Sequence, residues 1–86
     1  MSRKRLPAHI ARLKQAFERE LGAQVEVEEV APRRFRFGVV SDRFRRLRPL
    51  KRQDLLWDIA DRVLSREEVL EITLILAFHP SELEAV

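Results

Sequence analysis

The feature that most constrains the fold is a pair of alternating stretches on either side of Pro32. Residues 24–30 alternate Val with Glu, and residues 34–40 alternate Phe or Val with polar or small residues. Successive side chains of a strand point to opposite faces, so each stretch predicts a strand with one buried and one wet face. The short connection predicts an antiparallel hairpin. In such a hairpin the acids of the first strand can face basic residues of the second: Glu26 and Glu28 against Arg34 and Arg36.

Two longer segments have helical periodicity. In residues 8–21 and 50–64, apolar side chains recur every three or four positions, which is the spacing of one buried helix face. Gly22 suits the end of the first helix, and Pro49 suits the start of the second. A shorter helical turn is predicted over residues 42–47, because N-capping residue types precede it.

The third predicted strand covers residues 71–78. It is apolar on both alternating faces, which is typical of a strand buried on both sides, so we place it at the centre of the sheet. A Ser-x-x-Glu pattern at residues 65–68 can start a helical turn before it, and residues 80–85 are predicted to be a final turn or tail.

These elements predict one α+β domain over residues 1–86. Its order is α-β-β-α-α-β, and its three-stranded sheet has helices packed on one face. The core is expected over about residues 8–83, after an N-terminal basic tail at residues 1–7.

The composition excludes several classes of protein. With 45% apolar and 36% charged residues, the chain is too apolar for a disordered protein and too charged for a membrane protein. No stretch of 18 apolar residues is present, and the N-terminus lacks the apolar core of a secretory signal. We therefore expect a cytoplasmic protein with no membrane partner.

The sequence offers little for catalysis or for a resident cofactor. It contains no Cys, and His9 and His79 are its two histidines, so a self-contained zinc or iron–sulfur site is excluded by ligand count. Its Ser residues lie at expected caps or termini, and His79 fits the end of a strand better than a catalytic base. We predict a protein that is not an enzyme and has no cofactor.

The strongest charged feature is the segment 42–52, which we call the basic bend. Residues 1–52 hold 15 basic and 6 acidic side chains, whereas residues 53–86 hold 2 and 8, so the chain is electrically two-sided. The basic bend connects a predicted strand to a predicted helix, whose N-terminal end adds partial positive charge. Its cations form the candidate site for nucleic acid or another anion: Arg43, Arg45, Arg46, Arg48, Lys51 and Arg52. The alternative is a solvated surface partly paired with Asp42 and Asp54.

Two aromatic residues lie in or near the basic bend. Phe44 is predicted to anchor the short turn in the core rather than to stack on bases. Trp57 lies near the apolar face of the second long helix but not on it. It is either a buried residue whose N–H has a partner or an anchor at a protein interface.

Four motifs resemble the BolA family. VSDRF at residues 40–44 and LKRQDLLWDIA at residues 50–60 resemble a strand ending V-S-D-x-F and a helix beginning with an R-H-R-L-V-Y-like segment. EITLILA at residues 71–77, followed by HPSEL, is similar to the family's H-A-L-x-x-K-T followed by T-P-E-E-W. The resemblance covers about residues 8–83. It implies the same element order as the periodicity does, in a fold similar to the type II KH fold.

The sequence departs from the family at the residues that hold a cofactor. Members use the His that opens the last strand to ligate an iron–sulfur cluster shared with a monothiol glutaredoxin. That His corresponds here to Glu71, the family's helix His corresponds to Gln53, and the hairpin loop at residues 30–34 has no Cys or His. A carboxylate at Glu71 is a poor substitute for imidazole at such a cluster. KH domains carry G-x-x-G in the bend where this chain has RRLR at residues 45–48, so side chains rather than a close backbone would have to contact an anion.

Three functional interpretations follow. The leading one is a non-enzymatic BolA-like protein whose basic bend binds nucleic acid, with the regulatory, transcriptional or stress role that the resemblance implies. The second is a protein-interaction adaptor that uses Trp57, with a glutaredoxin-type partner or another copy of itself. The third is a diverged domain whose function lies elsewhere.

Overall fold

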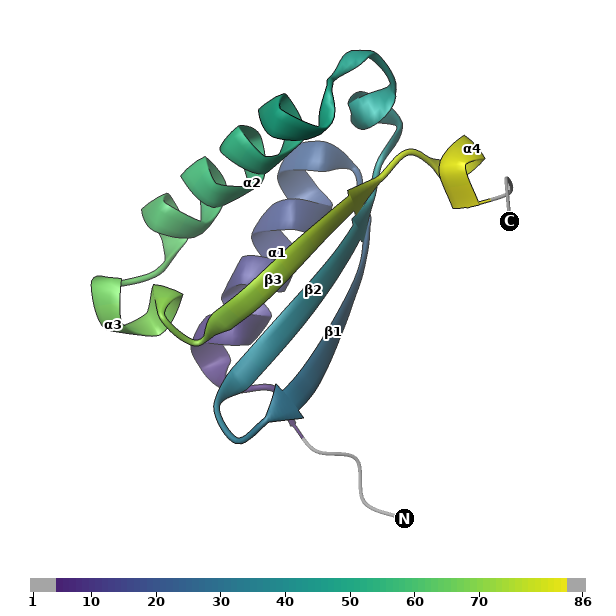
Figure 1. The fold of residues 1–86 in the computed structure, drawn as a ribbon. Helices are drawn as coiled ribbons and strands as arrows, with labels where there is room; N and C mark the ends of the chain where they lie inside the picture. Colours follow the sequence, from purple (N-terminus) through teal and green to yellow (C-terminus); the bar gives the residue numbers. More distant parts are fainter. Residues whose placement is uncertain (1–4, 84–86) are drawn as a thin grey trace.

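The order of helices and strands agrees with the α-β-β-α-α-β prediction (Figure 1). The structure, a computed structural model, describes residues 5–83, so residues 1–4 of the predicted basic tail and residues 84–86 lie outside it. The elements are α1 (Ala8–Leu21), β1 (Gln24–Ala31), β2 (Arg34–Val40), the 3₁₀ turn η1 (Asp42–Arg46), α2 (Pro49–Val63), α3 (Arg66–Val69), β3 (Ile72–Phe78) and α4 (Pro80–Leu83). The predicted α+β class is confirmed.

The three strands form one mixed sheet in the order β1-β2-β3. β1 pairs antiparallel with β2, and β2 pairs parallel with β3. The prediction that the last strand is central is therefore wrong: β2 is central and β3 lies at an edge. The hairpin occupies one side of β2, and the crossover through α2 and α3 brings β3 parallel to its other side.

The hairpin register confirms one of the two predicted charge pairs. Glu28 lies opposite Arg36, and their side chains form an ion pair. Glu26 lies opposite Gly38 instead, and Arg34 pairs with Ala31 at the end of the hairpin, beyond a register shift. The second pair was wrong because the turn, not the charges, sets which residues face each other.

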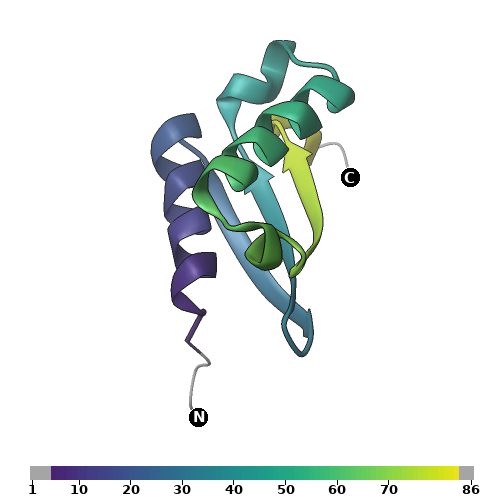
Figure 2. The same cartoon turned by 90° about the vertical axis from the view of Figure 1, so that its left-hand side faces the viewer.

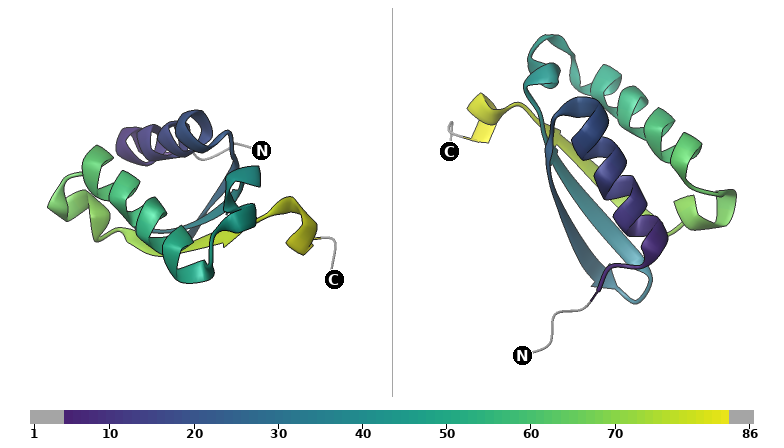
Figure 3. Two further views of the ribbon diagram at one scale, coloured as in Figure 1. Left: turned by 90° about the horizontal axis from the view of Figure 1, so that it is seen from above. Right: turned by 180° about the vertical axis from the view of Figure 1, so that it is seen from behind.

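The core lies between the sheet and the two long helices, which cover the same face (Figures 2 and 3). Phe17 of α1 meets Phe37 of β2 edge-to-face, with ring centroids 5.7 Å apart. The predicted buried face of α2 is confirmed at Leu56, Ile59 and Ala60. Among residues 5–83, only α4 approaches the opposite face of the sheet, at its rim.

Local capping explains where several helices begin and end. Gly22 ends α1 in the left-handed conformation, with φ of 57°, which glycine adopts without a steric cost. Ser65 and Glu68 form both hydrogen bonds of a capping box at α3, as the Ser-x-x-Glu pattern predicts. These elements are specified by residues close to them in the sequence.

Candidate anion-binding site

The basic bend lies at the end of the sheet where β2 and β3 both finish (Figure 1). The backbone N–H of Ser41 donates to the carbonyl of Phe78 at 3.0 Å, so the chain enters the bend beside the last residue of β3. Parallel strands end at the same edge, and the segments that follow them, η1 and α4, are therefore neighbours. The fold thus places α4 next to the basic bend.

Ser41 fixes the entry to the bend. Its hydroxyl donates to the carbonyl of Leu21 at 2.7 Å and accepts from the backbone N–H of Arg43 at 3.1 Å. The first bond satisfies a carbonyl at the end of α1, and the second caps η1. Phe44 then inserts into the core with no exposed surface, as predicted, so the bend is held at both its start and its middle.

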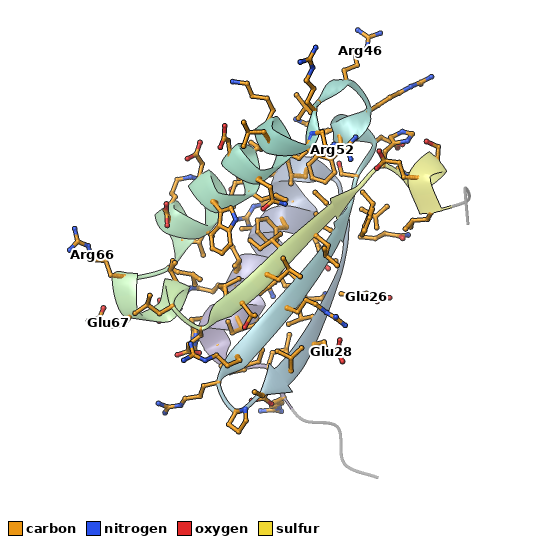
Figure 4. The ribbon with its side chains drawn as sticks, viewed as in Figure 1. Glu26, Glu28, Arg46, Arg52, Arg66 and Glu67 are labelled. Atoms are coloured by element: carbon orange, nitrogen blue, oxygen red, sulfur yellow. The ribbon has the colours of Figure 1, made fainter. Side chains whose placement is uncertain are left out.

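Five of the six predicted cations are exposed to solvent. They are Arg43, Arg45, Arg46, Arg48 and Lys51, which we call the exposed cations. None of their side chains forms an ion pair with any residue between 5 and 83. Asp42 lies 3.6 Å from the Nε2 of His79 instead, and no ion pair is formed by Asp54 within the same range. Figure 4 shows Arg46 extending away from the body of the protein at the tip of the bend.

Arg52 is different, and the expectation that all six cations are exposed together is wrong for this residue. Its side chain is 9% exposed. It donates from Nε to the carbonyl of Leu47 at 2.8 Å and makes a two-pronged contact with Glu82 at 2.8 and 3.1 Å. Its guanidinium also lies 5.6 Å from the centroid of the Phe44 ring, within cation–π range. Arg52 therefore joins the bend to α4 and is not available to an anion in this arrangement.

Glu82 is the acidic partner that the sequence reasoning missed. The hydrogen bond from Arg52, followed by one from the backbone N–H of His79, holds the pKa of Glu82 below its ordinary value. The His79 bond is 2.7 Å long. Glu82 lies three residues after His79, the residue that precedes α4, and a Glu at this position is a recognisable capping signal. The hydrogen bond to the His79 backbone could therefore have been predicted from the sequence, but the pairing with Arg52 could not.

The start of α2 strengthens the positive field. Its N-cap is Arg48, Pro49 occupies its first turn, and that turn holds no acidic residue. The backbone N–H groups at the start of a helix carry partial positive charge, and no carboxylate of the first turn offsets it. Helix and exposed cations therefore attract negative charge to the same corner.

Trp57 lies partly buried one turn further along α2 than Gln53. Its Nε1 donates to the Gln53 side-chain oxygen at 3.1 Å, and the Gln53 nitrogen donates to the carbonyl of Ile75 at 2.8 Å. The predicted N–H partner for Trp57 is thus present, and it connects the indole to the outer edge of β3. The role of Trp57 as an anchor at a protein interface stays a prediction.

The positions that correspond to the family's ligand histidines do not fit an iron–sulfur cluster. The amide of Gln53 is engaged as described, and Glu71 contacts the Nε2 of His9 at 2.9 Å. Over residues 5–83, no three His, Cys, Asp or Glu side chains are grouped so that they could hold a metal ion. The two positions hold an amide and a carboxylate, and no thiolate is present, whereas such clusters are held by thiolates and imidazoles.

No helix within residues 5–83 is both long enough and apolar enough to cross a bilayer. A cytoplasmic location stays a prediction.

No family model and no curated protein matches the sequence. The structure is similar to the BolA domain of SufE1 from Arabidopsis thaliana, with a TM-score of 0.75 and 27% identity over 91% of this chain and 99% of that one. It is also similar to BolA1 from Arabidopsis thaliana, with a TM-score of 0.72 and 22% identity over 90% and 98% of the two chains. A bol-like protein from Babesia bovis matches with a TM-score of 0.64 and 19% identity over 96% of each chain.

These matches extend over nearly the whole of both chains in each pair. They agree with the BolA-like resemblance that the sequence motifs indicate. The sequence resemblance is therefore confirmed: this chain has a BolA-like fold.

Proposed function

We propose that this BolA-like domain is a non-enzymatic protein that binds nucleic acid through the phosphates, using the exposed cations of the basic bend. The observation that carries the proposal is that these five side chains are exposed and form no ion pair with any residue between 5 and 83. A charged surface that existed only for solubility would be expected to mix both signs. Here neither Asp42, within the basic bend, nor Asp54, just after it, forms an ion pair with the exposed cations.

The spread of the cations favours a polyanion over a single small anion. They are distributed over a 3₁₀ turn, the following loop and the first turn of α2. Arginine guanidinium groups contact phosphate oxygens in a two-pronged geometry, and successive phosphates of a nucleic-acid strand can meet several of them at once. A role in regulating transcription or a stress response, which the family resemblance suggests, belongs to this proposal.

Fluorescence anisotropy with labelled duplex and single-stranded probes of one length tests the proposal. For duplex DNA we expect the logarithm of the affinity to fall with the logarithm of salt concentration by about 0.9 per phosphate contacted. Arg46→Gln should weaken binding and reduce this slope by roughly one contact. Absence of binding at low salt, or binding that salt does not weaken, would overturn the proposal.

Arg66→Gln is the matched control. Arg66 is exposed on α3, makes no ion pair within residues 5–83, and lies at the far end of the molecule from Arg46 (Figure 4). The two variants lose the same charge from opposite ends. An equal effect of both would mean that binding follows net charge and not the bend.

A protein-interaction role is the second candidate, and α2 carries the observation that favours it. Leu50 is 73% exposed and lies seven residues before the partly buried Trp57, on the same side of the helix. Tryptophan is enriched among the residues that carry most of the binding energy at protein interfaces. Trp57→Ala should weaken binding of a protein partner, such as a monothiol glutaredoxin, and leave nucleic-acid binding unchanged. If Trp57→Ala left binding of the protein partner unchanged, the adaptor role would be contradicted and the nucleic-acid role would stand alone.

A further inference from the structure

An open hollow lies beside the basic bend, between the end of α1, η1 and the middle of α2. Its volume is about 560 Å³, within the roughly 300–1,000 Å³ of small-ligand sites. Ser41 joins two of its walls, because its hydroxyl donates to the carbonyl of Leu21 while it caps η1. Figure 2 shows the end of α1 and the bend at the same end of the molecule. The hollow is therefore continuous with the surface that carries the exposed cations.

The lining of the hollow is largely apolar. Leu21 and Ile59 are 4% and 3% exposed, and Leu47 and Leu55 are partly exposed beside them. On α2, Leu55 and Ile59 are four residues apart and so lie on one side of the helix. Gln53, which donates to β3, lies on the opposite side of the same helix. The hollow is therefore separate from the surface that contains Trp57.

The rim of the hollow is positively charged. Arg43 and Arg46 both line it, and side chains three residues apart in a 3₁₀ helix stand one above the other. Glu20 also lines it, but this carboxylate makes a two-pronged contact with Arg62 at 2.6 and 2.9 Å. The hydrogen bond from Arg62 holds the pKa of Glu20 below its ordinary value. The acid of the rim is therefore already paired with a cation of α2, whereas the two arginines of η1 form no ion pair with any residue between 5 and 83.

We propose that this hollow binds one unstacked base of a single-stranded nucleic acid, while Arg43 and Arg46 contact the phosphates beside that base. A ligand at this position must offer an apolar face to the leucines and negative charge to the rim, and a nucleotide has both on neighbouring groups. In a duplex the base faces are stacked on one another, whereas the bases of a single strand can be turned outward. Guanidinium planes can also stack on such a base. The inference rests on the proposed function and adds that the basic bend prefers single strands.

Fluorescence anisotropy of the full chain with three probes of equal length tests the inference. The probes are an intact single strand, an abasic single strand whose sugar–phosphate backbone carries no bases, and a duplex. We expect the intact strand to bind at least about fivefold more tightly than the abasic strand, the low end of what one stacked base contributes. Both strands carry the same number of phosphates, so charge alone cannot produce this ratio. Leu55→Gln should remove most of it, because it puts a polar group into the hollow, and should leave binding of the duplex unchanged.

Leu50→Gln is the matched control. Leu50 is 73% exposed in the first turn of the same helix and does not line the hollow. The same substitution at this position should leave the ratio between the intact and the abasic strand as it is in the wild type. Circular dichroism checks that each variant folds, and Leu55→Ala replaces Leu55→Gln if that variant does not. The comparison of the two single strands on the wild type needs no variant.

Several outcomes would overturn the inference. One is equal affinity for the intact and the abasic strand, which would leave the hollow to a different ligand. Another is a ratio that Leu55→Gln leaves unchanged, or that Leu55→Gln and Leu50→Gln reduce equally. In these cases binding of the duplex that weakens as salt rises would still support the proposed function. Absence of binding to all three probes at low salt would overturn the proposed function and this inference with it.

Discussion

At the scale of single residues, Arg52 shows how one position among several similar ones takes a different role. In the sequence it is one more cation of the basic bend. In the fold its guanidinium contacts carbonyl oxygens at Leu47 and Ala77, the carboxylate of Glu82 and the ring of Phe44. The partner acid lies 30 residues further along the chain, so residue type and local pattern could not separate Arg52 from its exposed neighbours.

Arg52→Lys should destabilise the protein while keeping its charge. Lysine cannot make the two-pronged contact with Glu82 and the carbonyl contacts together, so we expect a loss of about 1–3 kcal/mol in the free energy of unfolding. Urea denaturation measures it. Arg46→Lys, at an exposed cation, should change the same quantity by less than about 0.5 kcal/mol. Equal effects of the two substitutions would contradict the structural role of Arg52.

Glu82 makes part of the stability dependent on pH. The pKa of Glu82 in the folded state is lowered, first by Arg52 and then by the His79 backbone. Its contribution to stability is therefore fully present above the ordinary value of 4.5 and is lost as pH falls below that value through the lowered pKa of the folded state. Glu82→Gln should therefore be less stable than the wild type near neutral pH, and the difference should shrink in acid. Unfolding measured at a series of pH values checks this.

The control for that series is Glu67→Gln. Glu67 is exposed on α3 and makes no hydrogen bond or ion pair with residues 5–83 (Figure 4). The free energy of unfolding of this variant should change with pH in the same way as that of the wild type across the acid range. A difference in the free energy of unfolding between wild type and Glu82→Gln that did not change with pH would mean that the charge of the Glu82 carboxylate does not stabilise α4.

At the scale of elements, the sequence predicted what depends on near neighbours. Periodicity located α1 and α2, alternation located β1 and β2, and capping patterns located η1 and α3. The position of β3 was predicted wrongly because its apolar outward residues indicate burial, whereas its place in the sheet follows from the crossover through α2.

The outer edge of β3 is partly closed by α2. The side chains of Gln53 and Arg52 donate to the carbonyls of Ile75 and Ala77, which would otherwise be free acceptors at a sheet edge. Periodicity alone cannot predict this, because it depends on the distance between two elements that are separated in sequence. Gln53 also accepts the hydrogen bond of the Trp57 N–H. A substitution of Gln53 therefore removes one contact within α2 and one contact to β3.

Gln53→Leu should destabilise the junction between α2 and β3. It removes the donor to Ile75 and the acceptor of the Trp57 N–H, and we expect a loss of about 1–3 kcal/mol in the free energy of unfolding. In a Trp57→Phe background the same change should cost less, because no indole N–H is left without a partner. A double-mutant cycle measured by denaturation checks the coupling. Additive effects would mean that the Gln53–Trp57 bond contributes nothing measurable.

At the scale of the whole molecule, the fold keeps the charge separation that the sequence contains. The exposed cations gather at one end, while Asp54, Asp58 and Asp61 lie exposed along α2. The sequence predicted a two-sided molecule and the place of its cations, but not which of them are accessible. Accessibility depended on α4, whose packing against the bend is set by the parallel pairing of β2 and β3.

Crowding of like charges should make stability depend on salt. The exposed cations repel one another in the folded state, so the free energy of unfolding should rise between about 10 and 500 mM sodium chloride as screening increases. Replacing Arg43, Arg46 and Lys51 by Gln should raise stability at low salt and flatten this dependence. Urea denaturation at each salt concentration measures both effects. A steeper dependence in the triple variant would contradict the idea.

The two ends of the sheet also differ in what can be attached to them. α1 starts at the end away from the basic bend, whereas α4 finishes beside it, held by Arg52 (Figure 1). A fluorophore or affinity tag fused after α4 would stand next to the exposed cations and interfere with anything that approaches them. One placed ahead of α1 would report from the remote end, which makes the N-terminal fusion the sound choice for every binding assay on this protein.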